Sequence, residues 1–382
     1  MNLNRTRDAI LAGIGSVGLL VYILACASFS PDDSKILFPS LDPKSGQLAL
    51  ALYNRETGGT EYLLSLPLPK EEGSFIRPVW TPDGRRVVAL WPDESGNNHL
   101  RLMVLPLKTR EPIRMLALGA RKELIASQVV PPAIVGSHLF MAAGSQVLRL
   151  DLESGEVKTN HVEGEILLLG QRERVYYLRE RSAAEAPEQS RLEVGRLDLK
   201  NLTCVPLFQT PAPVGGELKW FAVSRDGSRV ALLEDKEDAP VLLIFDGKDL
   251  ARTIPLGTKG DELKPGNLVW SSDGTTLYAA YVKSQGAERS HACGVLEVTV
   301  DGRPPRTLPL FNLTGRLDEA DPYLFQIDLS HDGKTLATCS TYLSFPDDKR
   351  LKPEDVALYL IDLSRPDRKV TKVPVSGPSP RS

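Results

Sequence analysis

An aspartate recurs in a fixed setting along this chain, and its carboxylate is the first side chain to consider as a metal ligand or a general acid. The first copy reads Ser30-Pro31-Asp32-Asp33. Four later copies place Gly directly after Asp, at Asp83 and Gly84, Asp226 and Gly227, Asp273 and Gly274, and Asp332 and Gly333. Asp bonds its own backbone in turns, and Gly accepts a positive φ that other residues resist. The same pair in each copy therefore favours a structural turn over a catalytic or metal-binding role.

The other residues that carry chemistry form no motif. The histidines (His99, His138, His161, His291 and His331) lack metal-ligand spacing, and no H-E-x-x-H is present. No G-x-S-x-G elbow occurs. Gly13-x-Gly15-x-x-Gly18 matches a dinucleotide fingerprint in spelling, but it follows no strand and lies in an apolar N-terminal stretch. The sequence therefore predicts no metal, no cofactor and no enzymatic activity.

The composition indicates a large all-β chain with many turns. The 382 residues are 42% hydrophobic and include 30 Gly and 29 Pro, and alternating apolar runs such as 147–152 dominate after residue 27. A net charge of −3 and an aromatic content of 6% provide no basic surface for nucleic acid. Cys204, Cys293 and Cys339 lie far apart, which leaves two readings open, buried thiols or a Cys293–Cys339 disulfide.

The spacing of the repeated turn predicts the fold. Neighbouring clear copies begin 47 to 59 residues apart, which is the length of one four-stranded propeller blade. In each copy an apolar strand runs into the turn and a second apolar strand follows, as in a hairpin. We predict a β-propeller with seven blades, at about 29–67, 75–118, 131–163, 165–208, 217–256, 267–310 and 323–375. Blade three replaces the Asp-Gly turn by Gly136-Ser137, and blade four by Arg172-Glu173.

Two of the copies resemble a known family. The stretches Trp80-Thr81-Pro82-Asp83-Gly84 and Trp270-Ser271-Ser272-Asp273-Gly274 look like the W-S-P-D-G core of TolB-like propeller repeats, which are relatives of WD-repeat propellers. The resemblance implies binding platforms and, in some members, an attached peptidase. The recurrent Trp80, Trp220 and Trp270 are expected to pack between blades.

The N-terminus resembles an export signal. Arg5 and Arg7 precede an uncharged apolar stretch at 9–27, long enough to cross a bilayer, and their charge favours a cytoplasmic N-terminus. Three alternatives stay open: an uncleaved anchor, a lipoprotein with lipidated Cys26, or a cleaved signal peptide. Because the strand before Ser30 overlaps this apolar stretch, either the span ends near Leu24 or the first inner strand is short. We expect a signal or anchor at 1–27, the propeller at 28–375 and a disordered tail at 376–382.

Candidate binding residues fall on one predicted face. In a propeller, the connections between strands 2 and 3 and between blades share a face, and here they are expected to be long, including 181–191, 234–239, 283–291 and 342–355. Insertions gathered on one face are typical of a binding surface. The candidate partner-binding residues are Arg181, Arg191, Asp235, Glu237, Arg289, His291, Tyr342, Phe345, Asp347 and Arg350.

These observations predict a non-enzymatic, membrane-tethered interaction or scaffold module on the extracytoplasmic side of the cell membrane. Its expected partners are an envelope protein or polymer on the long-loop face and the membrane itself, and no nucleic acid. The alternative is a small-ligand, polysaccharide-binding or enzymatic propeller that uses its central channel, where polar groups from several blades can converge.

Overall fold

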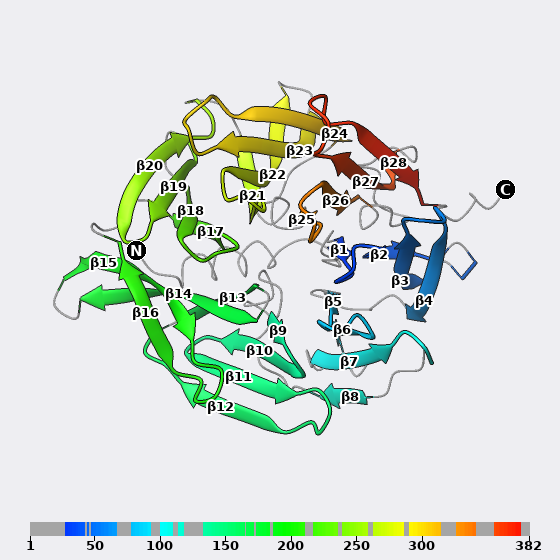
Figure 1. Ribbon diagram of the computed structural model, residues 1–382, viewed down its shortest axis with the longest axis horizontal. Coiled ribbons are helices and arrows are strands. Elements are labelled where there is room, and N and C mark those ends of the chain that lie inside the picture. The colour runs from blue at the N-terminus through cyan, green and yellow to red at the C-terminus, as the bar shows by residue number, and fades with distance from the viewer. Residues whose placement is uncertain are drawn as a thin grey trace.

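The computed structural model describes residues 27–375, apart from 43, 46, 67–77, 93–99, 110–113, 118–132, 165, 172, 184–185, 211–216, 236–238, 259–262, 286–289, 315–325 and 341–354. Within these residues the chain forms seven four-stranded antiparallel sheets arranged in a ring (Figure 1). The predicted all-β propeller of seven four-stranded blades is therefore confirmed. Each blade is continuous in sequence, and its first strand lies nearest the centre of the ring (Figure 1).

The first four blades have the following strands. Blade 1 contains β1 (Ser28–Phe29), β2 (Lys35–Leu41), β3 (Leu48–Asn54) and β4 (Thr60–Leu66). Blade 2 contains β5 (Val79–Trp80), β6 (Arg86–Pro92), β7 (Leu100–Pro106) and β8 (Arg114–Ala117). Blade 3 contains β9 (Ala133–Val135), β10 (His138–Ala143), β11 (Gln146–Asp151) and β12 (Val157–His161). Blade 4 contains β13 (Ile166–Gln171), β14 (Arg174–Ala183), β15 (Ala186–Leu197) and β16 (Cys204–Gln209).

The last three blades complete the ring. Blade 5 contains β17 (Glu217–Val223), β18 (Arg229–Asp235), β19 (Val241–Asp246) and β20 (Asp249–Pro255). Blade 6 contains β21 (Leu263–Trp270), β22 (Thr276–Gln285), β23 (Ser290–Thr299) and β24 (Arg306–Thr314). Blade 7 contains β25 (Asp328–Leu329), β26 (Thr335–Cys339), β27 (Ala357–Asp362) and β28 (Val370–Pro374).

The repeated aspartates hold the turn between the first two strands of five blades. In blade 5, the Ser224 hydroxyl donates to Asp226 Oδ1 at 2.6 Å, and the Ser228 N–H donates to the same oxygen at 3.0 Å. Gly227 has a φ of +79°. The Ser224 hydrogen bond is the largest cause that lowers the pKa of Asp226, to about 2. The hydroxyl contact repeats at 2.6 Å for Asp32, Asp83, Asp273 and Asp332. The predicted structural role of these turns is confirmed.

The core lies between the blades. Separate apolar clusters fill the interfaces of blades 2 and 3, 3 and 4, 4 and 5, and 5 and 6, and a larger one extends over blades 6, 7, 1 and 2. Trp80 Nε1 donates to the Ser28 carbonyl of the preceding blade at 3.0 Å, and Trp270 Nε1 to that of Ala222 at 3.2 Å. Trp220 packs in the cluster between blades 5 and 6. The predicted packing of these tryptophans between blades is confirmed.

Two of the cysteines belong to this core. Cys293 on β23 and Cys339 on β26 are not joined in a disulfide, and both are fully buried in the cluster that extends over blades 6, 7, 1 and 2. The structure therefore favours the buried-thiol reading for this pair over the disulfide. Cys204 on β16 also takes no part in a disulfide, but it is only partly buried.

The first blade begins where the predicted apolar segment ends. Ala27 is buried in the core, and the innermost strand β1 has only two residues. The inner strands β5 and β25 are also two residues long, so a short inner strand is not particular to the blade that follows the apolar segment. In the part of the chain that the structure describes, no helix has the length and apolar character to cross a membrane. Residues 1–26, including Cys26, and the predicted tail at 376–382 lie outside the described residues.

We predict that the repeated turns tolerate alanine unequally. A Cβ at Gly333, where φ is +73°, would lie 2.2 Å from Ser272 Oγ and 3.0 Å from Ser272 Cβ in the neighbouring blade. A Cβ at Gly274, where φ is +67°, would meet only Ser224 Cβ at 3.7 Å. Both substitutions incur a left-handed backbone cost of about 1–2 kcal/mol, and Gly333→Ala adds a steric cost. Urea unfolding should rank Gly333→Ala below Gly274→Ala, and equal midpoints would contradict the blade contact.

Candidate functional site

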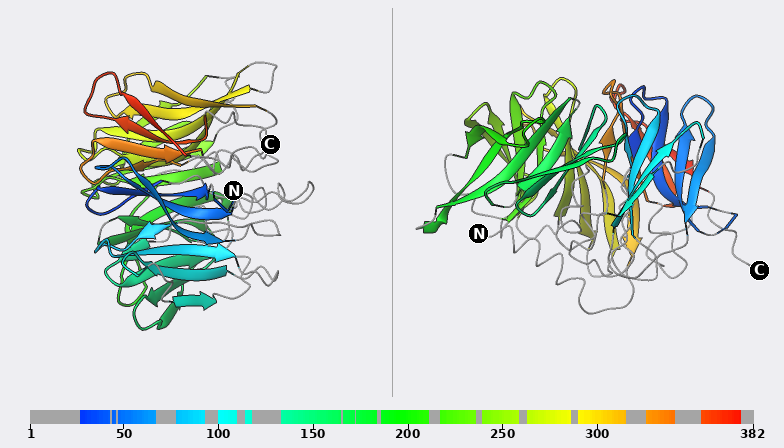
Figure 2. Two further views of the ribbon diagram at one scale, coloured as in Figure 1. Left: turned by 90° about the vertical axis from the view of Figure 1, so that its right-hand side faces the viewer. Right: turned by 90° about the horizontal axis from the view of Figure 1, so that it is seen from below.

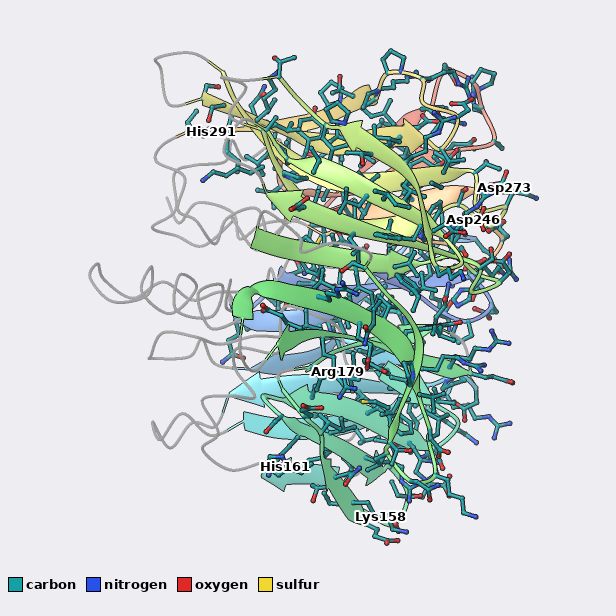
Figure 3. All side chains as sticks on the ribbon, turned by 90° about the vertical axis from the view of Figure 1, so that its left-hand side faces the viewer. Lys158, His161, Arg179, Asp246, Asp273 and His291 are labelled. Carbon is teal, nitrogen blue, oxygen red and sulfur yellow. The ribbon has the colours of Figure 1, made fainter. Side chains whose placement is uncertain are left out.

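The ends of the strands define two opposite faces of the ring (Figure 2). The turn face carries the connections between strands 1 and 2 and between strands 3 and 4, several of which have only two residues, such as 136–137, 172–173 and 247–248. The long-loop face carries the connections between strands 2 and 3 and between blades, including 67–78, 118–132 and 340–356. Asp246 and Asp273 lie at the turn face and His291 at the opposite end (Figure 3). The connections of the long-loop face are thus the more varied in length, from the two residues of 144–145 and 184–185 to the long connection at 340–356.

A cavity of about 640 Å³ runs along the ring axis and is lined by the first strand of every blade. Its wall is largely apolar, with Val79, Leu167, Leu169, Val269 and Leu329 among the lining residues. Glu173 and His331, both from turns between first and second strands, lie at the turn-face end. The volume is in the range of small-molecule sites.

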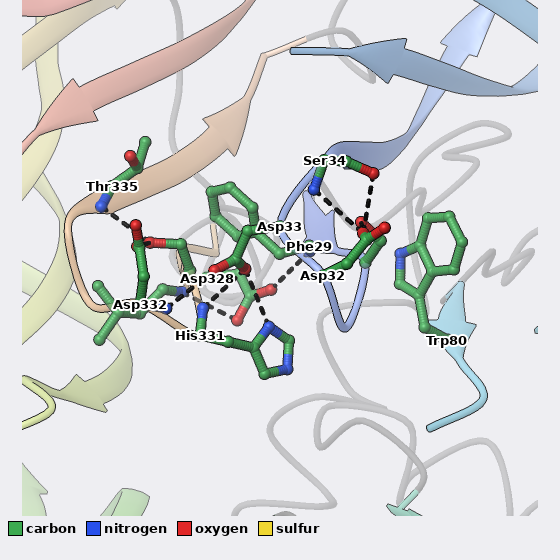
Figure 4. A network of polar contacts seen from close by, with 12 residues as sticks. Phe29, Asp32, Asp33, Ser34, Trp80, Asp328, His331, Asp332 and Thr335 are labelled. Atoms are coloured by element: carbon green, nitrogen blue, oxygen red, sulfur yellow. Dashed lines mark hydrogen bonds and ion pairs between the residues drawn. The ribbon is translucent and has the colours of Figure 1, made fainter. Parts of the chain in front are cut away.

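Asp328 introduces a carboxylate into this apolar wall. Its Oδ2 accepts the Phe29 N–H at 2.9 Å, and its Oδ1 accepts the Leu329 N–H at 3.0 Å (Figure 4). Burial disfavours the charged form and raises the pKa of Asp328 to about 6, against the opposing effect of the Phe29 hydrogen bond. Asp328 therefore joins blade 7 to blade 1 and exposes a titratable group to the channel.

Asp33 of blade 1 forms hydrogen bonds across the same interface, which we call the closing seam, between blades 7 and 1. It occupies the position that Gly takes in the other copies of the turn, with a φ of +58°. Its carboxylate accepts the His331 N–H at 2.7 Å and the Asp332 N–H at 2.8 Å, and its Oδ1 lies 3.0 Å from His331 Nδ1 (Figure 4). The Asp33 side chain is only 13% exposed. Asp33 therefore links the first and last blades through hydrogen bonds.

Several predicted loop residues lie in strands. Arg181 on β14 and Arg191 on β15 are register partners, so strands occupy most of the expected loop at 181–191, with β14 extending to Ala183 and β15 starting at Ala186. Lys283–His291 was likewise expected to be a loop, but His291 on β23 pairs with Ser284 on β22. The polar composition of these stretches concealed the continuation of both hairpins beyond the core. The loop positions expected for Arg181, Arg191 and His291 are therefore wrong.

His291 and Asp235 also differ from the prediction in their positions. His291 is only 7% exposed, and its Nδ1 lies 3.1 Å from Ser284 Oγ. A buried position removes it from the exposed binding face that the sequence predicted. Asp235 is the last residue of β18 and pairs with Glu217, so it lies at a strand end instead of within the expected loop at 234–239.

The other candidate binding residues are not placed by the structure. Glu237, Arg289, Tyr342, Phe345, Asp347 and Arg350 lie outside the described residues. Their role in partner binding stays a prediction. Among the described residues, no group of three His, Cys, Asp or Glu side chains has an arrangement that could hold a metal ion.

Sequence reasoning missed a buried ion pair in blade 4. Arg179 Nη2 lies 2.6 Å from Glu193 Oε1, and the Tyr177 hydroxyl donates to the same oxygen at 2.7 Å. Gln209 Nε2 donates to Glu193 Oε2 at 3.2 Å. Because the carboxylate on β15 is bound by side chains from the two neighbouring strands β14 and β16, the cluster links three strands of one blade. The alternation of Tyr177 with Arg179 on one strand face was its only sequence signal.

Asp33 and Asp328 had clearer signals in the sequence. Asp33 is the one residue that replaces Gly in the five copies of the turn. Asp328 occupies the strand position that Ser28, Val79, Ala222 and Val269 occupy in the other copies. At both positions a charged residue replaces small or apolar ones, and both positions lie where the last blade meets the first.

Comparisons with known proteins support the fold and no narrower family. No family model matches the chain, and no curated protein matches it in sequence. KlAtg21, solved in a complex with the coiled coil of AgAtg16, is similar with a TM-score of 0.54 and 13% identity, over 90% of this chain and 95% of that chain. A chain of the mitotic checkpoint complex matches with a TM-score of 0.50 and 12% identity, over 83% of this chain and 84% of that one.

A third solved structure is longer than this chain. It comes from an analysis of two prolyl endopeptidases and matches with a TM-score of 0.51 and 16% identity, over 87% of this chain but 47% of the endopeptidase chain. At these identities the likeness shows the fold alone. Together with the seven blades, it confirms the propeller fold that the resemblance predicted.

We predict that Asp33→Gly weakens the seam between blades 1 and 7. Glycine keeps the positive φ but removes an acceptor of two backbone N–H groups. Because hydrogen bonds to charged groups contribute about 1.5–3 kcal/mol, the expected net loss of unfolding free energy is about 2 kcal/mol in urea titrations. Asp33→Asn, which keeps a side-chain oxygen, should lose less. Unchanged stability of Asp33→Gly would mean that apolar packing alone closes the ring.

Asp328 gives the stability a definite pH dependence. Its pKa is about 6 in the folded protein against 3.8 for an ordinary Asp, so the folded state binds more protons between these values. The Asp328 contribution to stability therefore falls as the pH rises from about 4 to about 6. Asp328→Asn should gain stability relative to the wild type over that window. Chemical denaturation at several pH values measures the difference, and a constant difference would contradict the assignment.

Proposed function

We propose that the protein is a non-enzymatic interaction scaffold that is tethered to the cell membrane through its N-terminal segment. The propeller lies on the extracytoplasmic side, and a protein or polymer of the envelope binds to the long-loop face. Arg5 and Arg7 before the apolar segment support the orientation. The burial of Ala27 and the start of β1 at Ser28 support a propeller that begins directly after that segment.

The uneven length of the connections carries this proposal. Hydrogen bonds from side chain to backbone fix the short turns of the turn face, as in the Asp226 and Asp273 turns. The connections of the long-loop face have no such repeated pattern in the sequence, and those at 118–132 and 340–356 are far longer than any two-residue turn. Variable loops on a rigid scaffold are where binding residues concentrate.

The described channel supports a binding role over catalysis. Asp328, the carboxylate in the apolar wall, already accepts backbone N–H groups with both of its oxygens. Catalytic sites usually gather several titratable groups with mutual contacts. A propeller similar in fold, KlAtg21, is solved with a coiled-coil partner, which is consistent with a protein-binding role for this chain.

Partner capture tests the proposal. We expect in-cell crosslinking and pull-down of the tagged full-length protein to yield a small, reproducible set of envelope components. Replacing 347–352 with a Gly/Ser segment should leave the melting temperature unchanged and reduce capture several-fold, because this segment belongs to the β26–β27 connection. As a matched control on the turn face, Lys200→Ser with Asn201→Gly in the β15–β16 hairpin should capture normally. Capture that is equal for both variants would refute the long-loop face as the contact surface.

A further inference from the structure

Apart from one histidine, the ionisable side chains that line the channel are carboxylates. Asp328 and Glu173 are the carboxylates among the residues that line it, and no Lys or Arg is among the described lining residues. His331 at the turn-face end is engaged with Asp33 through Nδ1. Arg174 follows Glu173, but its Nη1 donates to the Tyr176 hydroxyl at 3.4 Å. The cavity thus favours a cationic ligand over an anionic one.

Asp328 retains the capacity to bind a donor from the channel. Each of its oxygens accepts one backbone N–H, from Phe29 and Leu329, and a carboxylate oxygen has two acceptor sites. Both donors are uncharged, so they do not neutralise the carboxylate. A cation in the channel would remove the cost of a negative charge in an apolar wall, a cost that is visible as the pKa raised to about 6.

The surroundings of Asp328 suit an ammonium with an apolar stem. Val79, Leu167 and Val269 on three other inner strands are half-buried and line the same cavity. At about 640 Å³, the cavity accommodates a ligand considerably larger than a single ion. Burial of an alkyl stem against this wall adds a favourable apolar contribution to the ionic contact.

We propose that the channel is a binding site for a primary alkylammonium group, with the ammonium donating to the free acceptor positions of Asp328 and the alkyl stem packed on the apolar wall. This site is separate from the long-loop face and does not rest on the proposed scaffold function. The shared chemistry, an ammonium on an aliphatic stem, occurs in free alkylamines and in lysine side chains.

Calorimetry with matched six-carbon probes tests the charge preference. The full-length protein is placed in lipid nanodiscs and titrated with hexylamine, hexanol and hexanoate, with empty nanodiscs as the blank. We expect hexylamine to bind at least about tenfold more tightly than hexanol, because a hydrogen bond to a charged group contributes about 1.5–3 kcal/mol, and hexanoate to bind most weakly. Equal binding of the three probes, or no binding of hexylamine, would overturn the proposal.

Three variants test whether hexylamine binds at Asp328 in the channel. Asp328→Asn keeps an acceptor for the Phe29 N–H and should weaken hexylamine at least about tenfold. Asp249→Asn is the matched control, because Asp249 is exposed on the outer strand β20 and is not among the lining residues, so it should leave the affinity unchanged. Leu167→Trp, which adds bulk to the apolar wall and leaves Asp328 in place, should also abolish binding and covers the case in which Asp328→Asn fails to fold. Unaltered hexylamine binding in Asp328→Asn or Leu167→Trp would refute the site.

The pH dependence and a peptide probe complete the test. Hexylamine affinity should fall as the pH drops from 8 to 5, since Asp328 becomes protonated near pH 6. The titratable groups that face Asp328 are His331 and Asp33, which pair with each other. His331→Gln should therefore retain the pH dependence, and its loss would contradict the assignment to Asp328. Binding of a peptide with a C-terminal lysine would identify a lysine side chain as the source, whereas binding of hexylamine alone would identify a free amine.

Discussion

Closure of the ring is the constraint on which the rest of the structure depends. Each blade buries its sheet faces against its two neighbours, so a gap between any two blades would expose an apolar face on both sides. At six of the seven seams, the chain itself leads from one blade to the next. At the seam between blades 7 and 1 no strand is exchanged, and side chains join the ends: Asp33 binds the backbone of His331 and Asp332, and Asp328 binds the backbone of Phe29.

The repeated turn makes one face of the propeller regular from blade to blade and leaves the other face variable. A Ser or Thr hydroxyl, an Asp carboxylate and a Gly with positive φ hold the first hairpin of several blades in the same shape, and the Gly packs close to the turn of a neighbouring blade. This regularity leaves the turn face little freedom to differ between blades. The opposite ends of the same strands are free of it, which makes the long-loop face the part of the propeller suited to specific recognition.

Much of this architecture could be predicted because it repeats. The turn motif located five blades, alternating apolar runs located the other two, and Trp80 and Trp270 marked the packing of inner strands. Reasoning failed where a hairpin continues beyond the core, as at Arg181 and Arg191, because polar residues on a protruding ribbon resemble those of a loop. It also missed Asp328, since convergence of seven inner strands on one cavity is a property of the assembled ring and not of any local segment.

The continuity of each blade in sequence also determines when the ring can be completed. The partners of Asp33 and Asp328 at the closing seam are 298 to 299 residues apart along the chain. A chain that emerges from its N-terminus can form blade 1 and stack later blades on it in order, but that blade keeps an unpaired apolar flank until β25 and β26 follow. Loop-closure entropy grows only slowly with length, so the delay reflects the order of synthesis more than the cost of joining distant ends. The open ring is therefore the species most prone to aggregation during biogenesis, and its lifetime is set by the arrival of the last blade.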